Sequence, residues 1–570
     1  MQKSQFANIF GAALGLCLAL TASAQPVSDA AIDQQRRAQE REIQQRQRQE
    51  TGSDVRLPSI PLASTGLLPE AETPCFHIHS LQLQGQEVDH FPWLLDHADG
   101  RTQLERPDPA QGRCLGALGI QTVIDRLQNA LIARGYTTTR VLAPPQNLQT
   151  GALVLSLVPG HVGEIRWAPG TGQRASRWNT VPMQMGDLLN LRDVEQALEN
   201  YKRVPSTEAD IQITPGREPG TSDLVISHRQ PMPFRLSATA DDSGTHSTGK
   251  YQGSLTFSYD NWWNLSDLFY VTLLHDLGGS DPGARGTRGQ IVHYSVPFGY
   301  WLVGLTHTNN RYHQTVAGAN QDYVYSGTSR NLELKLSRVL HRDAAGKTSI
   351  SLKGFQRASN NYIDDAEVQV QRRVVGGLEW GLNHRRSWQG GSLEANVNYR
   401  QGTGAWGSLP APEEAFGEGT SRMRLWLLDA TVQQSFDLGA QRLSYSGNWR
   451  AQHNQTPLTP QDRFVIGGRF TVRGFDGLSV LMAERGWLLR NEFSAAIASG
   501  HQAYVGIDTG LVGGPSAANL VGSRLTGGVL GARGQVGPLQ WDVFVGRPLS
   551  RPDYFKTSAT TAGFSASVSF

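Results

Sequence analysis

The chain has 570 residues, of which 62 are glycine and 39% are hydrophobic, and this length allows several domains. Its 52 basic and 50 acidic residues leave a formal net charge of +2, so the overall charge does not predict nucleic acid as a partner. A mean hydropathy of −0.37 argues against a membrane protein built from helices.

The N-terminus has the pattern of a secretory signal peptide at residues 1–24. Lys3 precedes an apolar run from Ile9 to Leu20, and small residues at Ala22 to Ala24 provide a cleavage site before Gln25. The apolar run is too short to span a membrane as a helix. We therefore expect the mature chain to be exported from the cytoplasm.

The chain has three cysteines, and Cys17 would be lost with the signal peptide. Cys75 and Cys114 then remain as an even pair in an oxidising compartment, where a structural disulfide is the expected state. The alternative is that both are free, buried thiols.

Within the segment 25–50, residues 28–50 are mostly good helix formers, with Ser28 or Asp29 as a possible N-cap, but their only large apolar side chains are Ile32 and Ile43. A helix that is polar all round has no core to pack on. It is therefore solvated, disordered, or held in a polar, water-filled cavity. Residues 51–74 are rich in proline, serine and threonine and are typical of a linker.

Two small α/β modules are predicted next, at residues 75–159 and 160–230. Each has a strand, a helix with one apolar face and then a pair of strands, so the second module repeats the order of the first. Each would leave a sheet edge free to add a strand from another chain, although the modules could also be only spacers. The expected strands are Phe76–Leu83, Tyr136–Leu142, Leu153–Val158, Val162–Trp167, Ala209–Thr214 and Asp223–His228, with helices over Ile120–Leu131 and after Asn190.

The pattern changes at residues 231–570 to strands of alternating polarity. Between Lys250 and Asp260, for example, apolar side chains alternate with polar ones. The alternation continues for about 340 residues without a helix, in an exported chain that ends on an aromatic strand, which favours a transmembrane β-barrel over a soluble sandwich. We expect about 16 strands, beginning near Phe234, Tyr251, Leu268, Ile291, Leu302, Leu332, Ile350, Val368, Leu393, Leu425, Leu443, Trp487, Tyr504, Leu525, Trp541 and Phe564.

A barrel of about 16 strands leaves an aqueous channel that a polar plug would close. The helix predicted at residues 25–50 has the composition for such a plug. The long loop at 456–485 is also expected to be enclosed by another part of the protein, because it mixes apolar and basic residues with flexible glycines. It carries the run Val472, Arg473, Gly474 and Phe475.

The alternation from Tyr504 to Leu511 places Asp508 on the wall of the channel, between Gly506 and Gly510, which leave room for a visiting side chain. Arg473 of the long loop is the candidate partner for this carboxylate. The alternatives are that Arg473 is a solvated turn residue and Asp508 an ordinary lumen charge.

Several runs together make the chain resemble the two-partner secretion transporters of the Gram-negative outer membrane, the TpsB family of haemolysin and adhesin exporters. The resemblance covers the whole mature chain. The runs are Gly135 to Val141 with Pro144 to Leu148, Asn190 to Glu195 with Pro215 and Gly216, Asp241 to Gly244 with Thr248 and Gly249, Val472 to Phe475, and Gly506 to Gly510.

The resemblance implies an N-terminal plug helix, two periplasmic POTRA domains (POTRA 1 at 75–159 and POTRA 2 at 160–230), and a 16-stranded barrel whose sixth extracellular loop folds back into the pore. It also implies that Arg473 pairs with Asp508. Phe475 stands where many relatives have tyrosine, so a phenolic hydroxyl would not be essential at this position.

The function implied by the resemblance is export of a large unfolded exoprotein, of the TpsA adhesin, haemolysin or toxin type. The exoprotein would dock on the POTRA domains, the plug would leave the pore, and folding outside the cell would drive export without nucleotide. The translocator would act as a monomer in outer-membrane lipid. A barrel-assembly factor is the alternative, although it would usually carry more POTRA copies and no plug helix. A passive porin would carry no POTRA modules.

No enzyme, metal or cofactor is expected. Residues Gly244 to Lys250 match G-x-x-x-x-G-K, but Tyr251 replaces the residue that should meet magnesium, and the segment joins two strands where a phosphate site needs a helix. His77 and His79 share one strand face without a third ligand in view. Neither a zincin motif nor a nucleophile elbow occurs.

Overall fold

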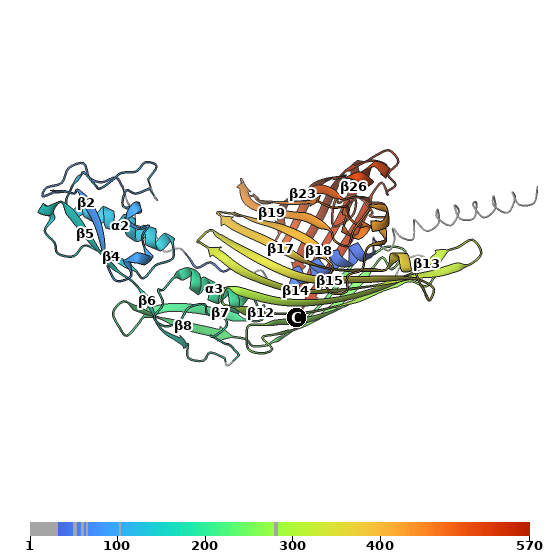
Figure 1. The fold of residues 1–570 in the computed structure, drawn as a ribbon, viewed down its shortest axis with the longest axis horizontal. Helices are drawn as coiled ribbons and strands as arrows, with labels where there is room; N and C mark the ends of the chain where they lie inside the picture. The colour runs from blue at the N-terminus through green and yellow to red at the C-terminus, as the bar shows by residue number, and fades with distance from the viewer. Residues whose placement is uncertain are drawn as a thin grey trace, which may run out of the picture.

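The computed structural model describes residues 32, 34–49, 54–58, 62–63, 66–101, 104–172, 174–278, 283–439 and 441–570. The signal peptide predicted at 1–24, with its Cys17, lies outside the described residues, as do parts of the segments 25–50 and 51–74. The molecule is elongated, with two small α/β modules at one end and a large closed barrel at the other (Figure 1). No helix within the described residues is both long enough and apolar enough to cross a membrane.

POTRA 1 is a three-stranded sheet covered by one helix. The sheet has the order β2-β5-β4, with β2 parallel and β4 antiparallel to β5. The helix α2 buries Val123, Leu127 and Leu131, which is the apolar face predicted from their spacing. The elements are β1 (Phe76–His77), β2 (Ser80–Gly85), η1 (Val88–His90), η2 (Leu95–His97), β3 (Cys114–Leu115), α2 (Ala117–Ala133), β4 (Arg140–Leu142), η3 (Leu148–Thr150) and β5 (Ala152–Val158).

A disulfide between Cys75 and Cys114 joins the beginning of POTRA 1 to β3. It closes a loop in which the two cysteines are 39 residues apart. The same region carries His77, which lies in β1 and pairs with Cys114 across the short β1–β3 ladder.

POTRA 2 repeats this architecture with β6 (His161–Trp167), α3 (Leu191–Lys202), β7 (Glu208–Pro215) and β8 (Thr221–Arg229) in the sheet order β6-β8-β7. Asn190 caps α3, because its side-chain oxygen accepts a hydrogen bond from the backbone N–H of Arg192. One face of α3 buries Val194 and Leu198 in the module, while the polar residues of its other face are also buried. The polar face therefore has a second partner, which is the barrel.

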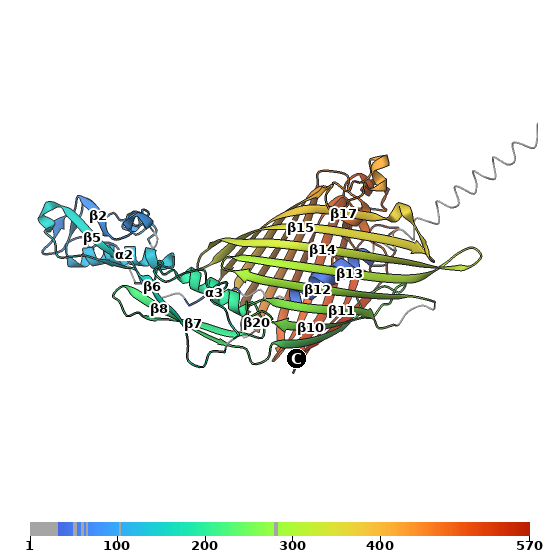
Figure 2. The same cartoon turned by 60° about the horizontal axis from the view of Figure 1, so that its bottom comes forward.

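The barrel has 16 antiparallel wall strands, and pairing of the first with the last closes it (Figure 2). Each predicted strand has one counterpart. The largest error in a strand start is at Leu332, because β14 already begins at Asp322, where it pairs with the end of β13. The start near Val368 is also wrong, because the chain first forms a short hairpin strand β16 (Ala366–Glu367) and the turn η4 (Gln369–Gln371). The wall strands are β9 (Phe234–Asp241), β10 (Gln252–Asp260), β11 (Leu268–Asp276), β12 (Gly286–Phe298), β13 (Trp301–Ala317), β14 (Asp322–Arg342), β15 (Gly346–Ile363), β17 (Arg373–Trp388), β18 (Gly391–Thr403), β19 (Arg424–Leu438), β20 (Gln441–Asn454), β23 (Arg485–Ala498), β24 (His501–Gly513), β25 (Arg524–Val536), β26 (Leu539–Ser550) and β27 (Thr561–Ser569).

Alternation along the strands separates an apolar outer face from a polar lumen. In β10, Leu255 and Phe257 point outward and are exposed, whereas Thr256 and Ser258 point inward and are buried. The inward side chains are buried because the helix at residues 34–49 lies inside the barrel and covers them (Figures 1 and 2). The lumen is thus a polar cavity with an occupant.

The path of the chain orients the barrel. POTRA 2 leads directly into β9, so the turns at 299–300 and 343–345 face the POTRA end, and the loops at 242–251 and 455–484 lie at the opposite end. The second of these loops contains η6 (Pro460–Asp462) and a separate two-stranded sheet of β21 (Phe464–Ile466) and β22 (Leu481–Ala483). The other loops include η5 (Pro412–Phe416) and η7 (Pro515–Asn519).

The disulfide of POTRA 1 gives a testable prediction. Replacing Cys75 and Cys114 together by alanine removes a cross-link over 39 residues, which should lower the free energy of unfolding of POTRA 1 by about 4 kcal/mol from loop entropy. Urea-dependent proteolysis of the full chain in detergent should show POTRA 1 opening first, with the barrel unchanged. Peptide mapping without reductant must recover the two cysteines as one linked pair; two free thiols would contradict the structure.

Candidate functional site

The long loop at 455–484 folds back into the barrel. Its β21–β22 hairpin contacts β23 and β24, and its apolar residues pack against the inner surface of the wall. Val472 is completely buried there. This packing explains why a glycine-rich loop contains so many apolar residues, because water does not surround them. The buried set is Ile466, Val472, Phe475, Leu481, Ala483, Leu488, Val512, Leu525 and Phe555.

The predicted partners Arg473 and Asp508 meet inside the barrel in a two-point ion pair. Nε of Arg473 donates to Oδ2 of Asp508 at 2.7 Å, and Nη2 donates to Oδ1 at 2.9 Å. The backbone N–H of Arg473 also donates to Oδ2, at 3.0 Å. Asp508 is fully buried, so these three hydrogen bonds stabilise a carboxylate that has lost its water.

The ion pair is part of a wider charge network. The third guanidinium nitrogen used by Arg473, Nη1, donates to Oε2 of Glu492 at 2.6 Å. Glu492 also pairs with Arg533 at 2.8 Å, and Nε of Arg490 lies 3.7 Å from Oδ2 of Asp508. Three arginines therefore face two carboxylates, which gives the network a net positive charge.

Glycines on three neighbouring strands make room for the loop. A Cβ atom on Gly506 of β24 would lie 2.7 Å from Nη2 of Arg473, and one on Gly527 of β25 would lie 1.8 Å from the carbonyl oxygen of Arg473. On β26, a Cβ on Gly546 would lie 2.9 Å from the Cα of Gly474. The loop therefore lies in a groove that only strands without side chains at these points can form.

Two further residues of the predicted motif also lie in this groove. Gly510 faces the loop, since a Cβ there would come within 2.9 Å of Ile466 Cγ2. Phe475 is buried edge-to-face against Phe555, with the ring centres 5.7 Å apart, so an apolar ring fills this position. Gly474 has φ of +97° and its Cβ would meet the backbone of Arg547, which explains the need for glycine after the arginine.

The helix at 34–49 occupies the rest of the lumen beside this loop. Gln45 donates to Ser254 on β10 at 3.0 Å, and Gln49 both donates to Ser237 on β9 and accepts from Ser258 on β10. Arg46, on another side of the helix, pairs with Glu333 on β14 at 3.3 Å. The helix thus binds two separate parts of the barrel wall through polar side chains.

The N-terminal half of the helix contacts the extracellular loops. Nη2 of Arg37 donates to the carbonyl oxygen of Gly477 in the long loop at 2.6 Å, and Nη1 donates to that of Ser243 in the first loop. Gln34 donates to Thr245 of the same loop at 2.8 Å. The helix therefore connects the long loop with the β9–β10 loop at the outer end of the pore.

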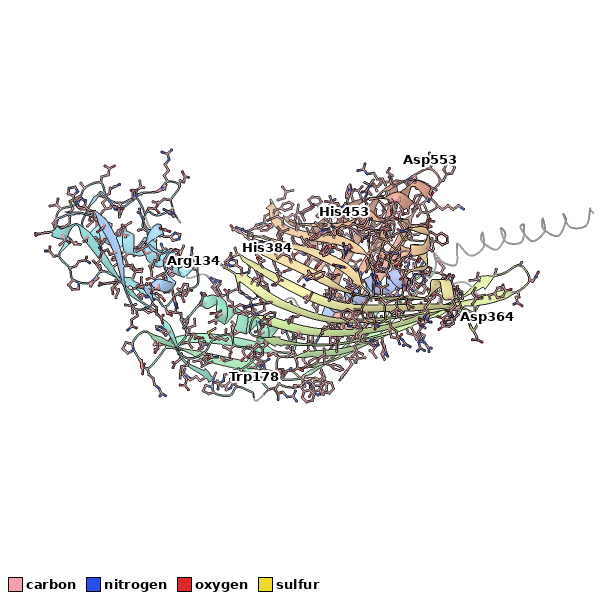
Figure 3. The ribbon with its side chains drawn as sticks, viewed as in Figure 1. Arg134, Trp178, Asp364, His384, His453 and Asp553 are labelled. Carbon is pink, nitrogen blue, oxygen red and sulfur yellow. A yellow bond between two sulfur atoms is a disulfide. The ribbon has the colours of Figure 1, made fainter. Side chains whose placement is uncertain are left out.

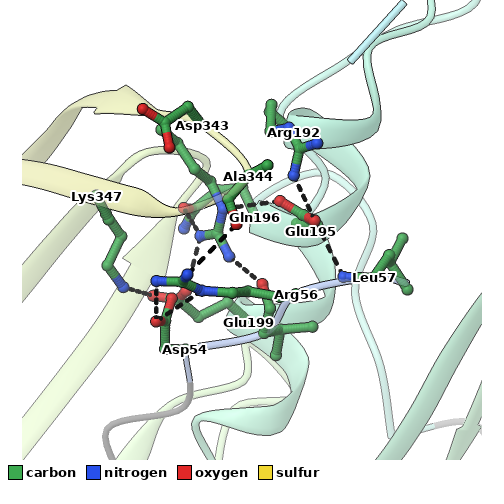
Figure 4. Close-up of polar contacts among 12 residues, drawn as sticks. Asp54, Arg56, Leu57, Arg192, Glu195, Gln196, Glu199, Asp343, Ala344 and Lys347 are labelled. Atoms are coloured by element: carbon green, nitrogen blue, oxygen red, sulfur yellow. Dashed lines mark hydrogen bonds and ion pairs between the residues drawn. The ribbon is translucent and has the colours of Figure 1, made fainter. Parts of the chain in front are cut away.

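At the opposite end, α3 of POTRA 2 is attached to the barrel by charged groups (Figure 4). Arg342, at the end of β14, donates to Gln196, to Glu199 at 2.7 Å and to Glu195 at 3.3 Å. Lys347 of β15 binds the other oxygen of Glu199 at 2.7 Å. The inner face of α3 is therefore fixed to the β14–β15 turn.

The linker after the pore helix joins the same cluster. The carbonyl oxygen of Val55 accepts from Arg342, and the N–H of Leu57 donates to Glu195 at 3.0 Å. Burial by itself would raise the pKa of Asp54, but hydrogen bonds from Arg56 and the nearby charge of Lys347 hold that pKa below its ordinary value. Asp54 therefore stays charged at neutral and mildly acidic pH, and its ion pairs are lost only when the pH falls through this lowered pKa.

The structure brings every predicted residue of the loop and wall motifs together, but other members of the site were missed. Arg490 and Glu492 lie at inward positions of the strand expected near Trp487, so the alternation of that strand could have identified them. The glycines Gly527 and Gly546 gave no signal of their own, because their role depends on which strands are neighbours. Among the described residues, no cluster of three potential metal ligands occurs.

Comparisons with known proteins agree with this architecture. Residues 220–534 match the family described as haemolysin secretion/activation protein ShlB/FhaC/HecB. Residues 76–160 match the ShlB-type POTRA domain, and residues 161–215 match a second POTRA domain.

Individual relatives extend over the whole chain. The outer membrane transporter CdiB-2 of Burkholderia pseudomallei strain 1026b is 35% identical over 579 residues, covering 97% of this chain and 98% of that protein. The hemolysin transporter protein HpmB of Proteus mirabilis is 23% identical over 505 residues, covering 84% of each. The solved structure of CdiB from Acinetobacter baumannii has a TM-score of 0.82 at 28% identity and covers 95% of this chain and 99% of that one.

The glycine groove yields a prediction about the position of the loop. In Gly506→Ala the new Cβ would lie 2.7 Å from Nη2 of Arg473 and 2.8 Å from the carbonyl oxygen of Asn491, so the guanidinium must shift from Asp508 and the loop loses part of its attachment to the wall. Gly513→Ala, on the same strand, is the matched control, because its nearest neighbour is 3.8 Å away. Hydrogen exchange in residues 464–483 should become severalfold faster in Gly506→Ala and stay unchanged in Gly513→Ala. Equal protection in both variants would contradict the groove.

Proposed function

Because the chain belongs to the haemolysin secretion/activation protein family, it is an outer-membrane translocator of a two-partner secretion system with periplasmic POTRA domains, and we propose how it handles its partner. The partner is one large exoprotein of the TpsA type. Its N-terminal secretion domain binds the POTRA domains, and its unfolded chain leaves through the barrel pore. The name of one relative, the hemolysin transporter protein HpmB, supports a haemolysin as one candidate for the exported protein.

The observation that carries the proposal is the polar character of the pore helix. The contacts described above between this helix and the wall and loops are hydrogen bonds and ion pairs, which water can replace at a small net change in free energy. Its large side chain Ile43 is already 49% exposed in the lumen, so leaving the pore sacrifices little apolar burial. The helix is therefore suited to act as a plug that an arriving chain displaces.

The long loop is held differently and stays in the pore during export. Arg473 and Asp508 are paired away from water, and removing one of them would leave the other charge buried. The apolar residues of the loop would also be exposed to water if the loop left. We assign the plug role to the helix and the role of a fixed internal clasp to the loop.

The exoprotein is recognised at the sheet edges of the POTRA domains. Among the residues that the structure describes, the edge strand β4 of POTRA 1 pairs only with β5, and its Leu142 is exposed. An extended segment can add to such an edge through backbone hydrogen bonds and seat its side chains on the exposed apolar ones. Two POTRA domains and a pore-filling helix favour translocation over the assembly of other barrels. The translocator acts as a monomer, since one chain forms the complete barrel.

No nucleotide is available outside the cytoplasm, so folding of the exported chain at the cell surface drives transport. The family consists of transporters, and neither a catalytic centre nor a bound cofactor takes part in the proposed mechanism.

Loss of the clasp should stop export. In Arg473→Ala, Asp508 and Glu492 remain buried without their main partner, a change worth about 3 to 5 kcal/mol in buried ion pairs. Release of the exoprotein into the medium should fall at least tenfold with normal amounts of barrel in the outer membrane. Arg473→Lys should retain an intermediate level, because lysine restores the charge without the two-point geometry. Full secretion by Arg473→Ala would exclude the clasp role.

Removal of the plug should open the pore. Deleting residues 28–50 while keeping Asp54 to Leu57, which bind POTRA 2 and the barrel, should raise single-channel conductance in planar bilayers. The control is the undeleted chain with the substitution Ile43→Gln, since Ile43 is exposed in the lumen. That control should conduct like the parent chain. Unchanged conductance after the deletion, with a barrel that still inserts, would refute the plug.

A further inference from the structure

The segment between β6 and α3 leaves POTRA 2 and lies against the rim of the barrel. Asn179 is buried, and its side-chain N–H groups donate to the carbonyl oxygens of Leu265 at 2.7 Å and Pro297 at 3.0 Å. The backbone carbonyl oxygen of Asn179 accepts a hydrogen bond from the backbone N–H of Gly299 at 2.7 Å. Because these partners belong to the β10–β11 turn and to the end of β12, the segment is fixed to two periplasmic turns at once.

The neighbouring Trp178 lies at the surface, against the outer face of the barrel. It is 68% exposed, and its ring lies edge-to-face against Phe298, with centres 5.4 Å apart. Phe298 is on the outer face of β12, where the exposed side chains of a barrel contact lipid. Figure 3 places Trp178 at the outer side of the junction between POTRA 2 and the barrel. A residue of the periplasmic module therefore extends the lipid-facing surface.

An aromatic girdle follows this rim of the barrel. Tyr259 lies with its ring centre 4.7 Å from that of Phe234 and 5.2 Å from that of Trp262, and Trp262 lies 4.9 Å from Phe269. Such girdles mark the level of the lipid headgroups. POTRA 2 joins it through Arg174, whose guanidinium lies 6.0 Å from the ring centre of Tyr259 and donates to its hydroxyl at 3.4 Å.

A groove of about 780 Å³ opens between this segment and the barrel turn. Tryptophans line it from both sides, and Arg177 lies at the groove with its guanidinium 5.8 Å from the ring centre of Trp167. Apolar walls next to a cation match the junction between the acyl chains and the phosphate of a phospholipid. The lining includes Ile165, Trp167, Arg177, Trp178, Val181, Met183, Trp263 and Leu265.

We propose that residues 174–183 form a membrane foot, which binds a phospholipid of the periplasmic leaflet in the groove beside Trp178 and Trp263. Continuity with the girdle argues for lipid over a segment of the exported chain, because the foot lies at the level and on the side where the bilayer lies. The membrane then holds POTRA 2 from outside while the cluster of Arg342 holds α3 from inside. These two attachments fix the orientation of POTRA 2 toward the pore.

The depth of a probe at the foot tests the proposal. The mature chain has its two cysteines in a disulfide, so Trp178→Cys provides a single reactive thiol for a polarity-sensitive fluorophore. The full chain is placed in vesicles of phosphatidylethanolamine and phosphatidylglycerol. Leu118→Cys on α2 of POTRA 1 is the matched control, because Leu118 is 69% exposed and POTRA 1 is the module at the end of the molecule away from the barrel (Figure 1).

The label at 178 should be quenched by lipids that carry a quencher near the headgroup. Aqueous acrylamide should quench the label at 178 severalfold less than it quenches the label at 118. Trp263→Cys, on the barrel turn, should report the same depth even if a change at 178 disturbs POTRA 2. The proposal fails if acrylamide quenches 178 and 263 as strongly as 118. It also fails if protection of 178 appears only when the secretion domain of the exoprotein is added, since the groove would then bind protein.

Discussion

The buried carboxylate of Asp508 is the constraint around which the pore is organised. A charge without water needs a partner of opposite sign, and Arg473 supplies two side-chain donors and one backbone donor. The arginine can reach that position only because Gly506, Gly527 and Gly546 remove side chains from the wall. Charge, shape and the apolar packing of the loop thus specify the same position, and no one of them would suffice alone.

The two occupants of the lumen differ in how they are held. The loop combines a buried ion network with apolar packing, whereas the helix is bound by polar groups that water can also satisfy. Arg37 connects the helix to Gly477 of the loop at the outer end, and the linker connects it to Glu195 of POTRA 2 at the inner end. We infer that an exoprotein bound to POTRA 2 acts on the helix through this short linker, while the clasp keeps the loop in place.

Much of this architecture can be read from the sequence, because a two-residue period leaves a regular trace in each wall strand. That period predicted the 16 strands, the polar lumen and the inward direction of Asp508. It did not predict contacts that depend on which strands or domains become neighbours. Arg342 looks like an ordinary charge at a strand end, yet it binds α3 and the linker. Trp178 likewise lies outside any periodic element, so the sequence did not predict that its ring packs against Phe298 at the rim of the barrel.

The central claim is that the helix leaves the pore during export while the loop remains. Spin labels at Ile43→Cys in the helix and Leu255→Cys on the outer wall report one distance, and labels at Leu478→Cys in the loop and Leu255→Cys report the other; all three native side chains are exposed. On addition of the secretion domain of the exoprotein, the helix-to-wall distance should lengthen and the loop-to-wall distance should stay the same. A helix that keeps its distance while the loop moves away from the wall would contradict the account.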